Sequence, residues 1–168
     1  MEQNCNEQFL EDLVRVDLVP TSECDFSVPF TIAGIISMPA TKTVGGQSVS
    51  RIGTPALTLA YTMTDDGEGE MDASPTLRQS EKTTMYGIVV THELQAPVVS
   101  NYESMRTSVN GLHSKDFHMV LTMADGTRYL CYSVPNGSDV TLEEQNGEVT
   151  EQTVKVTLKS LSHIIRLE

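Results

Sequence analysis

The sequence predicts a mainly β fold, an antiparallel β-sandwich or barrel of about seven strands with one short inserted helix. Asp125-Gly126 separates two runs rich in β-branched and aromatic residues over 116–135, a pattern typical of a β-hairpin. Apolar and polar residues alternate over 149–167, as they do in a strand with one buried face. The 168 residues suffice for one domain with its own core, so we expect a single domain over 1–168.

The hairpin over 116–135 allows its strand register to be predicted. If Asp125 and Gly126 form a two-residue type I′ loop, the strands pair outward from it: Ala124 with Thr127, Leu121 with Leu130, Met119 with Tyr132 and Phe117 with Val134. One face of the hairpin is then an apolar ladder that belongs to the core. The other face is mixed, and we expect it to contact the N-terminal segment or a neighbouring subunit through Val120, Tyr129 and Cys131.

The N-terminal part of the chain is expected to begin with a short element and a buried strand. Apolar residues at helical spacing over 6–16 allow an N-terminal amphipathic helix, although Val14 and Val16 suit a strand equally. The apolar stretch 26–38 indicates a buried strand, and Pro29 restricts its start to a sheet edge.

Residues 40–82 differ in composition from the rest of the chain. The segment is polar, contains glycines and an acidic run over 65–72, and holds one clear strand at 57–63. A connection this long inside a compact domain rarely lacks a function, so we interpret it as an arm that becomes ordered against a neighbouring subunit. A long hairpin with a mobile tip is the alternative. The apolar residues of the arm are its expected subunit contacts: Val44, Val49, Ile52, Leu57, Leu59, Tyr61 and Leu77.

The second half of the chain is predicted to contain further strands and the helix. A strand is expected at 85–94, before Pro97. Ser100 and Glu103 form a capping-box pattern that starts a helix over about 101–110, and Gly111 is placed to end it. Strands at 140–142 and 149–167 follow, the latter with a phase slip at 159–160 that indicates a β-bulge.

The composition argues against nucleic acid or a membrane as the ligand. The formal net charge is -12, whereas affinity for a phosphate backbone comes from Lys and Arg that displace counterions. No stretch approaches the ~20 apolar residues of a membrane helix. The acidic N-terminal residues do not match a secretion signal. We therefore expect a soluble protein made in a cytoplasm, without tight nucleic-acid binding and without membrane contact.

No motif for catalysis, a metal or a cofactor is found in the sequence, and we expect none of the three. The cysteines are widely spaced and form no C-x-x-C pair, so reduced structural thiols are expected. The acidic run 65–72 departs from the calcium-loop pattern because Gly67 and Gly69 fall on ligand positions. The default for this run is a solvated charged segment, with weak calcium binding as the alternative.

One Ser/His/Asp grouping can be assembled from the predicted hairpin. Asp116 and His118 would share a face, with Ser133 opposite His118. A serine nucleophile needs a strained turn and nearby oxyanion donors, which a regular strand does not supply. We therefore interpret this grouping as a cross-strand hydrogen bond.

The order of these elements suggests a function class. A mainly β domain with one helix before the hairpin at 116–135, a polar arm at 40–82 and strong acidity resembles the tail-tube and tail-completion proteins of long-tailed phages. The resemblance implies a non-enzymatic virion protein in the tail or at the head–tail junction. It also implies partners among other virion proteins and copies of itself, and an acidic ring lumen through which DNA passes. A small cytoplasmic β-barrel that binds a ligand or a partner protein is the alternative.

Overall fold

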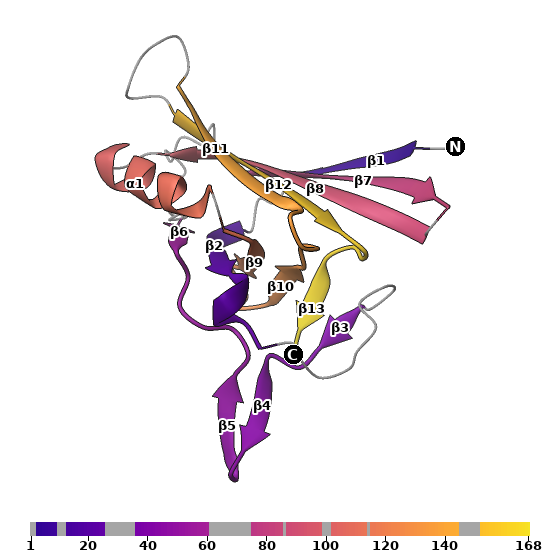
Figure 1. Cartoon of the computed structure of the whole chain (residues 1–168), viewed down its shortest axis with the longest axis vertical. Coiled ribbons are helices and arrows are strands. Elements are labelled where there is room, and N and C mark those ends of the chain that lie inside the picture. The colour runs from indigo at the N-terminus through magenta and orange to yellow at the C-terminus, as the bar shows by residue number, and fades with distance from the viewer. Residues whose placement is uncertain are drawn as a thin grey trace.

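In its described residues, the computed structural model contains mainly β-strands and one α-helix, which confirms that the fold is mainly β (Figure 1). The structure describes residues 3–9, 13–25, 36–60, 75–85, 87–98, 102–113, 115–144 and 152–168. Their strands form a five-stranded sheet, a six-stranded sheet and a separate two-stranded hairpin. The prediction of about seven strands was therefore too low.

The five-stranded sheet is antiparallel and contains the longest strands. Its strands are, in spatial order, β1 (Gln3–Phe9), β7 (Thr76–Thr84), β8 (Gly87–Val98), β12 (Gln152–Ser160) and β11 (Ser138–Glu144). Along β12, Val154, Val156 and Leu158 are buried as predicted, and the lysines and threonines alternate with them. One face of the sheet therefore lies against the core.

The six-stranded sheet is mixed, because β3 and β13 run parallel. Its strands are, in spatial order, β3 (Ser37–Met38), β13 (Ile165–Leu167), β10 (Arg128–Cys131), β9 (Phe117–Met123), β2 (Leu13–Pro20) and β6 (Leu57–Ala60). Among the described strands, neither β3 nor β6 pairs with the five-stranded sheet. The two sheets do not close into a barrel, so the barrel form of the prediction was wrong.

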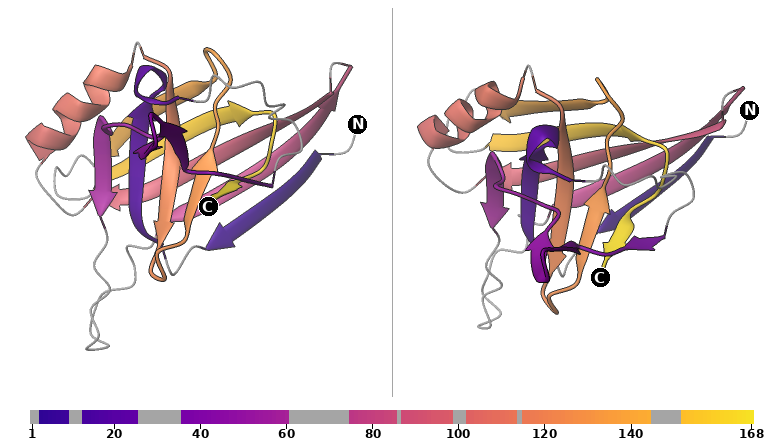
Figure 2. Two further views of the ribbon diagram at one scale, coloured as in Figure 1. Left: turned by 90° about the horizontal axis from the view of Figure 1, so that it is seen from below. Right: turned by 60° about the horizontal axis from the view of Figure 1, so that its bottom comes forward.

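The two sheets face each other with steeply crossing strands, and the main core lies between them (Figure 2). Helix α1 (Tyr102–Leu112) closes one end of this core with Val109 and Leu112. The predicted helix is thus confirmed, but it continues through Gly111 instead of ending there. Further members of the core are Leu13, Val16, Leu18, Leu94, Phe117, Met119, Leu121 and Val140.

A second core cluster lies on the opposite face of the six-stranded sheet. Val120 and Leu130 on the central strands pack there with Ile165 of β13, and Met38 and Ala40 cover them. The first five residues of β9 are consequently all buried, although a strand with one solvated face would alternate. The chain itself covers the second face of the predicted hairpin.

The hairpin at 116–135 is confirmed, but its predicted register was wrong by one residue. Leu121 faces Tyr129 and Met119 faces Cys131. The amide of Met123 donates to the carbonyl of Thr127 at 2.8 Å, so the loop comprises residues 124–126. Gly126 has φ 88°, the left-handed conformation of a bulged three-residue loop. A one-residue slip moves every side chain of β10 to the other face.

Three other sequence-based expectations also need correction. The described part of the stretch 6–16 is extended and not helical: residues 6–9 belong to β1 and residues 13–16 to β2, so the strand alternative for Val14 and Val16 is confirmed. Residues 10–12 lie outside the described part. Pro97 does not end β8, which runs to Val98. The phase slip at 159–160 is not a bulge, because the chain leaves the five-stranded sheet after Ser160 and enters the six-stranded sheet at β13.

Candidate functional site

The stretch 40–82 is not one continuous arm. Leu57 and Leu59 on β6 and Leu77 on β7 are buried in the main core, and Ile52 packs against the second core cluster. These four residues are therefore structural, which corrects their expected role as subunit contacts. Tyr61 lies outside the described residues, as does the acidic run 65–72.

One part of the stretch does project from the body of the molecule. Strands β4 (Thr41–Val44) and β5 (Gln47–Ser50) pair only with each other and extend away from both sheets (Figure 1). Every residue of the two strands is exposed except Lys42, which is half-buried. Gly45 and Gly46 connect the strands with φ 57° and 83°, the positive values that a type I′ turn requires. We call residues 41–50 the projecting hairpin.

The projecting hairpin has two chemically different faces. Opposite residues are Lys42 and Val49, and Val44 and Gln47, so the two valines share a face. Val44 is 52% exposed and Val49 is 42% exposed. The other face carries only small hydroxyl side chains, namely Thr41, Thr43, Ser48 and Ser50. The hairpin thus presents two half-exposed valines on one side.

The base of the projecting hairpin is firmly attached. Lys42 Nζ forms an ion pair with the carboxylate of Asp25. The amide of Arg51 donates to the carbonyl of Ala40 at 2.8 Å, and the amide of Asp25 donates to the carbonyl of Arg51 at 2.8 Å. The amide of Ala40 donates to the carbonyl of Glu168 at 3.0 Å. These bonds orient the hairpin relative to the six-stranded sheet.

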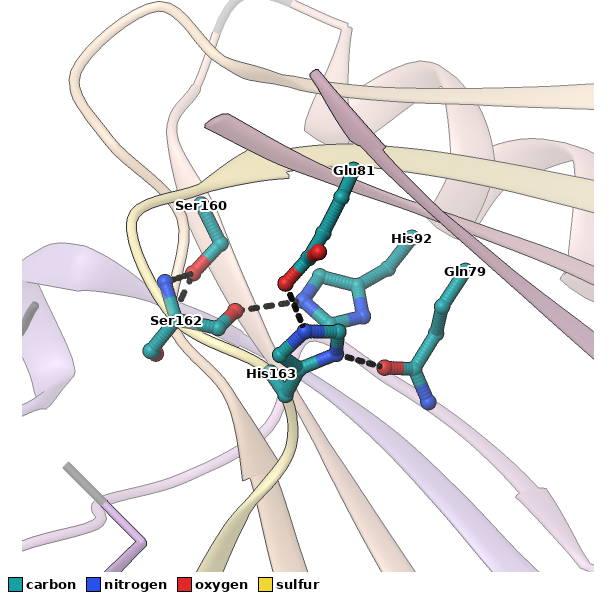
Figure 3. Close-up of polar contacts among 6 residues, drawn as sticks. All are labelled: Gln79, Glu81, His92, Ser160, Ser162 and His163. Carbon is teal, nitrogen blue, oxygen red and sulfur yellow. Dashed lines mark hydrogen bonds and ion pairs between the residues drawn. The ribbon is translucent and has the colours of Figure 1, made fainter. Parts of the chain in front are cut away.

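A polar cluster surrounds the crossover between β12 and β13 (Figure 3). His163 Nδ1 lies 2.9 Å from Gln79 Oε1, and His163 Nε2 contacts Glu81 Oε1. His92 Nε2 lies 3.1 Å from the carbonyl oxygen of Ser162 and donates to it. We call these residues, with Ser160, the corner cluster.

The corner cluster contains serine, histidine and glutamate but is not arranged for nucleophilic catalysis. Both ring nitrogens of His163 face side-chain oxygens of β7, and neither is directed at a serine hydroxyl (Figure 3). Ser160 Oγ accepts the amide hydrogen of Ser162 at 3.2 Å. A serine nucleophile requires a base within hydrogen-bond reach. The contacts instead fix the crossover against β7 and β8.

Burial keeps His92 of the corner cluster neutral. The side chain is fully buried, and this desolvation lowers its pKa to about 4 against the opposing effect of the Ser162 carbonyl. Its Nδ1 is buried and has no hydrogen-bond partner among the described residues. No sequence pattern indicated this cluster, because Gln79 and His163 are separated by 84 positions.

A surface pocket of about 310 Å³ lies at the open end of the β9–β10 hairpin. It is lined by Thr21 of the 3-10 helix η1 (Thr21–Glu23), by Cys24, and by hairpin residues Asp116, His118, Tyr132, Ser133 and Pro135. The structure thus brings together Asp116, His118 and Ser133, as the sequence predicted. The rings of His118 and Tyr132 stack with centroids 4.2 Å apart.

The pocket is not a catalytic triad either. The backbone amide of Ser133 donates to His118 Nδ1 at 3.0 Å, while Ser133 Oγ donates to the carbonyl of Val134 at 3.0 Å. The predicted cross-strand hydrogen bond is present, but its donor is the amide instead of the hydroxyl. Asp116 Oδ1 accepts the amide hydrogen of Asn136 at 3.1 Å. The hydrogen bonds of Asp116, His118 and Ser133 therefore stabilise the end of the hairpin and do not form a catalytic relay.

The imidazole, thiol and phenol groups of the pocket are held in their neutral forms. Burial lowers the pKa of His118 to about 4, with Asp116 acting in the opposite direction. Burial and the nearby Glu23 carboxylate raise the pKa of the Cys24 thiol to about 11. Burial also raises the pKa of Tyr132. The pocket therefore contains neither an imidazolium nor a reactive thiolate near neutral pH.

The predicted contact face of the β9–β10 hairpin does not exist as one surface. Val120 belongs to the second core cluster, whereas Cys131 is fully buried in the main core and Tyr129 packs against the main core. The register of β10 places Val120 on one side of the sheet and the other two residues on the opposite side. Val120 and Cys131 are therefore not accessible to a neighbouring subunit.

Comparison with protein-family models, with curated proteins and with solved structures finds no match to this chain. Within the described ranges, no group of three or more His, Cys, Asp or Glu side chains is placed to hold a metal ion. None of the described helices has the length and apolar character needed to cross a membrane.

Proposed function

We propose that this protein is a non-enzymatic structural subunit of a phage virion, in the tail or at the head–tail junction, that assembles with copies of itself. The observation that carries the proposal is the projecting hairpin, which extends from the body with Val44 and Val49 exposed on one face. An apolar face at the end of a fixed extension is suited to bind a neighbouring subunit. Other virion proteins are the further partners.

A receiving surface for the projecting hairpin lies elsewhere on the molecule. The end of the β7–β8 hairpin carries Met85, 89% exposed, and the exposed Ile88. This end lies far from the projecting hairpin (Figure 1). A contact between two different surfaces is heterologous, and repetition of such a contact produces closed rings or helical tubes. The net charge of -12 supports passage of DNA through the lumen of such a ring without adhesion.

The proposal is tested with paired substitutions in the projecting hairpin. Replacing Val44 and Val49 with Asp places charge on the contact face, whereas replacing Thr43 and Ser48 with Asp adds the same charge to the opposite face. Size-exclusion chromatography and electron microscopy should show rings or tubes for the original chain and the control, and monomers for the valine variant. A strictly monomeric original chain at high concentration, or equal disruption by both variants, would contradict the proposal.

The pocket supports a second candidate function, a small cytoplasmic module that binds a ligand or a partner protein. A volume of about 310 Å³ lies at the lower end of the range for small-molecule sites. Its aromatic stack and its mixture of polar groups are suited to orient a ligand. A monomeric chain that binds a ligand in this pocket would favour this candidate over the assembly subunit.

A further inference from the structure

The geometry points to the pocket between η1 and the open end of the β9–β10 hairpin as a binding site for an alkylammonium group. This inference is independent of the proposed assembly function. Its ligand is a primary amine on a short aliphatic chain, either a free amine or the side chain of a lysine from another copy.

The charge of the lining selects the class of ligand. Asp116 contributes a carboxylate, and the lining residues include neither lysine nor arginine. His118, Cys24 and Tyr132 are neutral near pH 7. The Glu23 carboxylate acts on Cys24 from beside the pocket. Asp116 would therefore repel an anionic ligand and attract a cationic one.

The hydrogen-bonding groups of the pocket match an ammonium group. An ammonium group has three donors and no acceptor. The carboxylate of Asp116 and the hydroxyl oxygen of Thr21 can both accept hydrogen bonds. Ser133 donates its hydroxyl hydrogen to Val134, which leaves lone pairs on Oγ as further acceptors. Charge-assisted bonds of this kind are stronger than neutral ones.

The remaining walls suit the aliphatic part of the ligand. The His118–Tyr132 stack presents aromatic surface, and Pro135 and Cys24 add weakly polar surface. Stacking against Tyr132 and the hydrogen bond from the Ser133 amide hold the His118 imidazole, and with it the pocket wall, in one orientation. The amide of Thr21 donates to the carbonyl of Asp116 at 2.9 Å, which fixes η1 beside the hairpin. The site is therefore largely formed before the ligand enters.

The test uses the full chain and two matched probes. n-Butylammonium and n-butanol have similar shapes and differ in charge, and their binding is followed by amide chemical shifts in two-dimensional NMR spectra. n-Butylammonium should shift amides around residues 116–118 and 132–134 and bind at least tenfold more tightly than n-butanol, with weaker binding at high salt. Equal affinities for the two probes, or shifts located elsewhere, would overturn the inference.

Two variants test whether the Asp116 carboxylate is the charge that binds n-butylammonium. Asp116→Asn keeps an oxygen acceptor for the Asn136 amide and should weaken n-butylammonium binding roughly tenfold or more. Asp125→Asn makes the same change at the opposite end of the same hairpin and should leave binding unchanged. Unaltered binding in the Asp116 variant would overturn the inference. If that variant does not fold, the comparison of the two probes on the original chain still decides the question.

The source of the ammonium group is distinguished by sedimentation. If a lysine of another copy occupies the pocket, the chain self-associates, and both n-butylammonium and Asp116→Asn reduce that association. If the ligand is a free amine, the probe binds equally well while the sedimentation coefficient does not change. Disruption by charge on Val44 and Val49 with no effect of n-butylammonium would assign assembly to the projecting hairpin and the pocket to a free amine.

Discussion

His92 Nε2 donates a hydrogen bond to the carbonyl oxygen of Ser162 at 3.1 Å, and this bond connects the centre of the five-stranded sheet to the crossover that leads into β13. The crossover carries the chain from one sheet to the other, so the bond helps to fix the two layers relative to each other. The bond requires only the neutral imidazole, and burial provides a reason for the ring to stay neutral.

The free energy of unfolding should fall as pH decreases from about 6.5 to about 4. His92 and His118 have folded-state pKa values near 4, below the ordinary value of 6.5, so the unfolded chain takes up these protons first. The contribution of the two histidines to the free energy of unfolding is complete above pH 6.5 and is lost as pH falls toward 4. Each shift corresponds to about 3 kcal/mol at most. Urea denaturation at several pH values measures the slope.

Matched variants test whether the buried imidazoles cause the pH dependence of the free energy of unfolding. His92→Gln cannot titrate and should flatten the pH dependence, although it also lowers stability at pH 7 because the buried site is repacked. His113→Gln makes the same substitution at an exposed position just after α1 and serves as the control. A slope that is identical in the original chain and in His92→Gln would show that other groups cause the acid sensitivity.

Two glycine-to-alanine substitutions should have opposite effects on stability. Gly126 has φ 88°, so Gly126→Ala should cost about 1 kcal/mol through backbone strain alone, since a Cβ there meets no atom within 4 Å. Gly111 lies inside α1 without a positive φ, and a Cβ there also meets open space. Gly111→Ala should therefore stabilise the protein by about 0.5–1 kcal/mol. Thermal and urea denaturation measure both effects, and destabilisation by Gly111→Ala would contradict the helix boundary.

Cys131 should resist alkylation in the folded protein far more strongly than an exposed thiol. Full burial raises its pKa to about 12, and the thiolate is the form that reacts. Peptide mass spectrometry after brief iodoacetamide treatment, with and without urea, measures the protection. Cys24 should be protected less, because it is half-buried and its pKa is raised to about 11. Rapid labelling of Cys131 without urea would contradict its place in the main core.

The corrected position of Cys131 shows which structural features a local sequence pattern can predict. Asp125-Gly126 fits both a two-residue and a three-residue loop, and the difference of one residue decides which face Cys131 occupies. The alternation of Val154, Val156 and Leu158 predicted their buried face correctly, because one side of β12 is apolar. Local pattern thus predicts faces well and register poorly.

Strand β7, whose stability comes from its neighbours, was not predicted. In β7, Leu77 is the one aliphatic residue among polar ones, so the stretch lacked a strand pattern. It nevertheless forms a strand because it pairs with β1 on one side and β8 on the other. The corner cluster and the pocket depend on such long-range pairing. Of the candidate sites, the sequence predicted the Asp116, His118 and Ser133 grouping and the exposed valines of the projecting hairpin.

His163 and Glu81 should show a small favourable coupling in a double-mutant cycle. His163→Ala and Glu81→Ala each remove one side of a contact that joins the β12–β13 crossover to β7. The His163 side chain is 51% exposed, so solvent screening limits the coupling to roughly 0.5–1 kcal/mol. The single variants should also accelerate hydrogen exchange at residues 161–165 while the amides of β9 keep their protection, because the contact holds the crossover and not the core. Lys155 and Glu143, an ion pair on the five-stranded sheet at 3.0 Å, provide the control cycle, which should leave exchange at the crossover unchanged. Zero coupling between His163 and Glu81 together with unchanged exchange would mean that the backbone alone positions this corner.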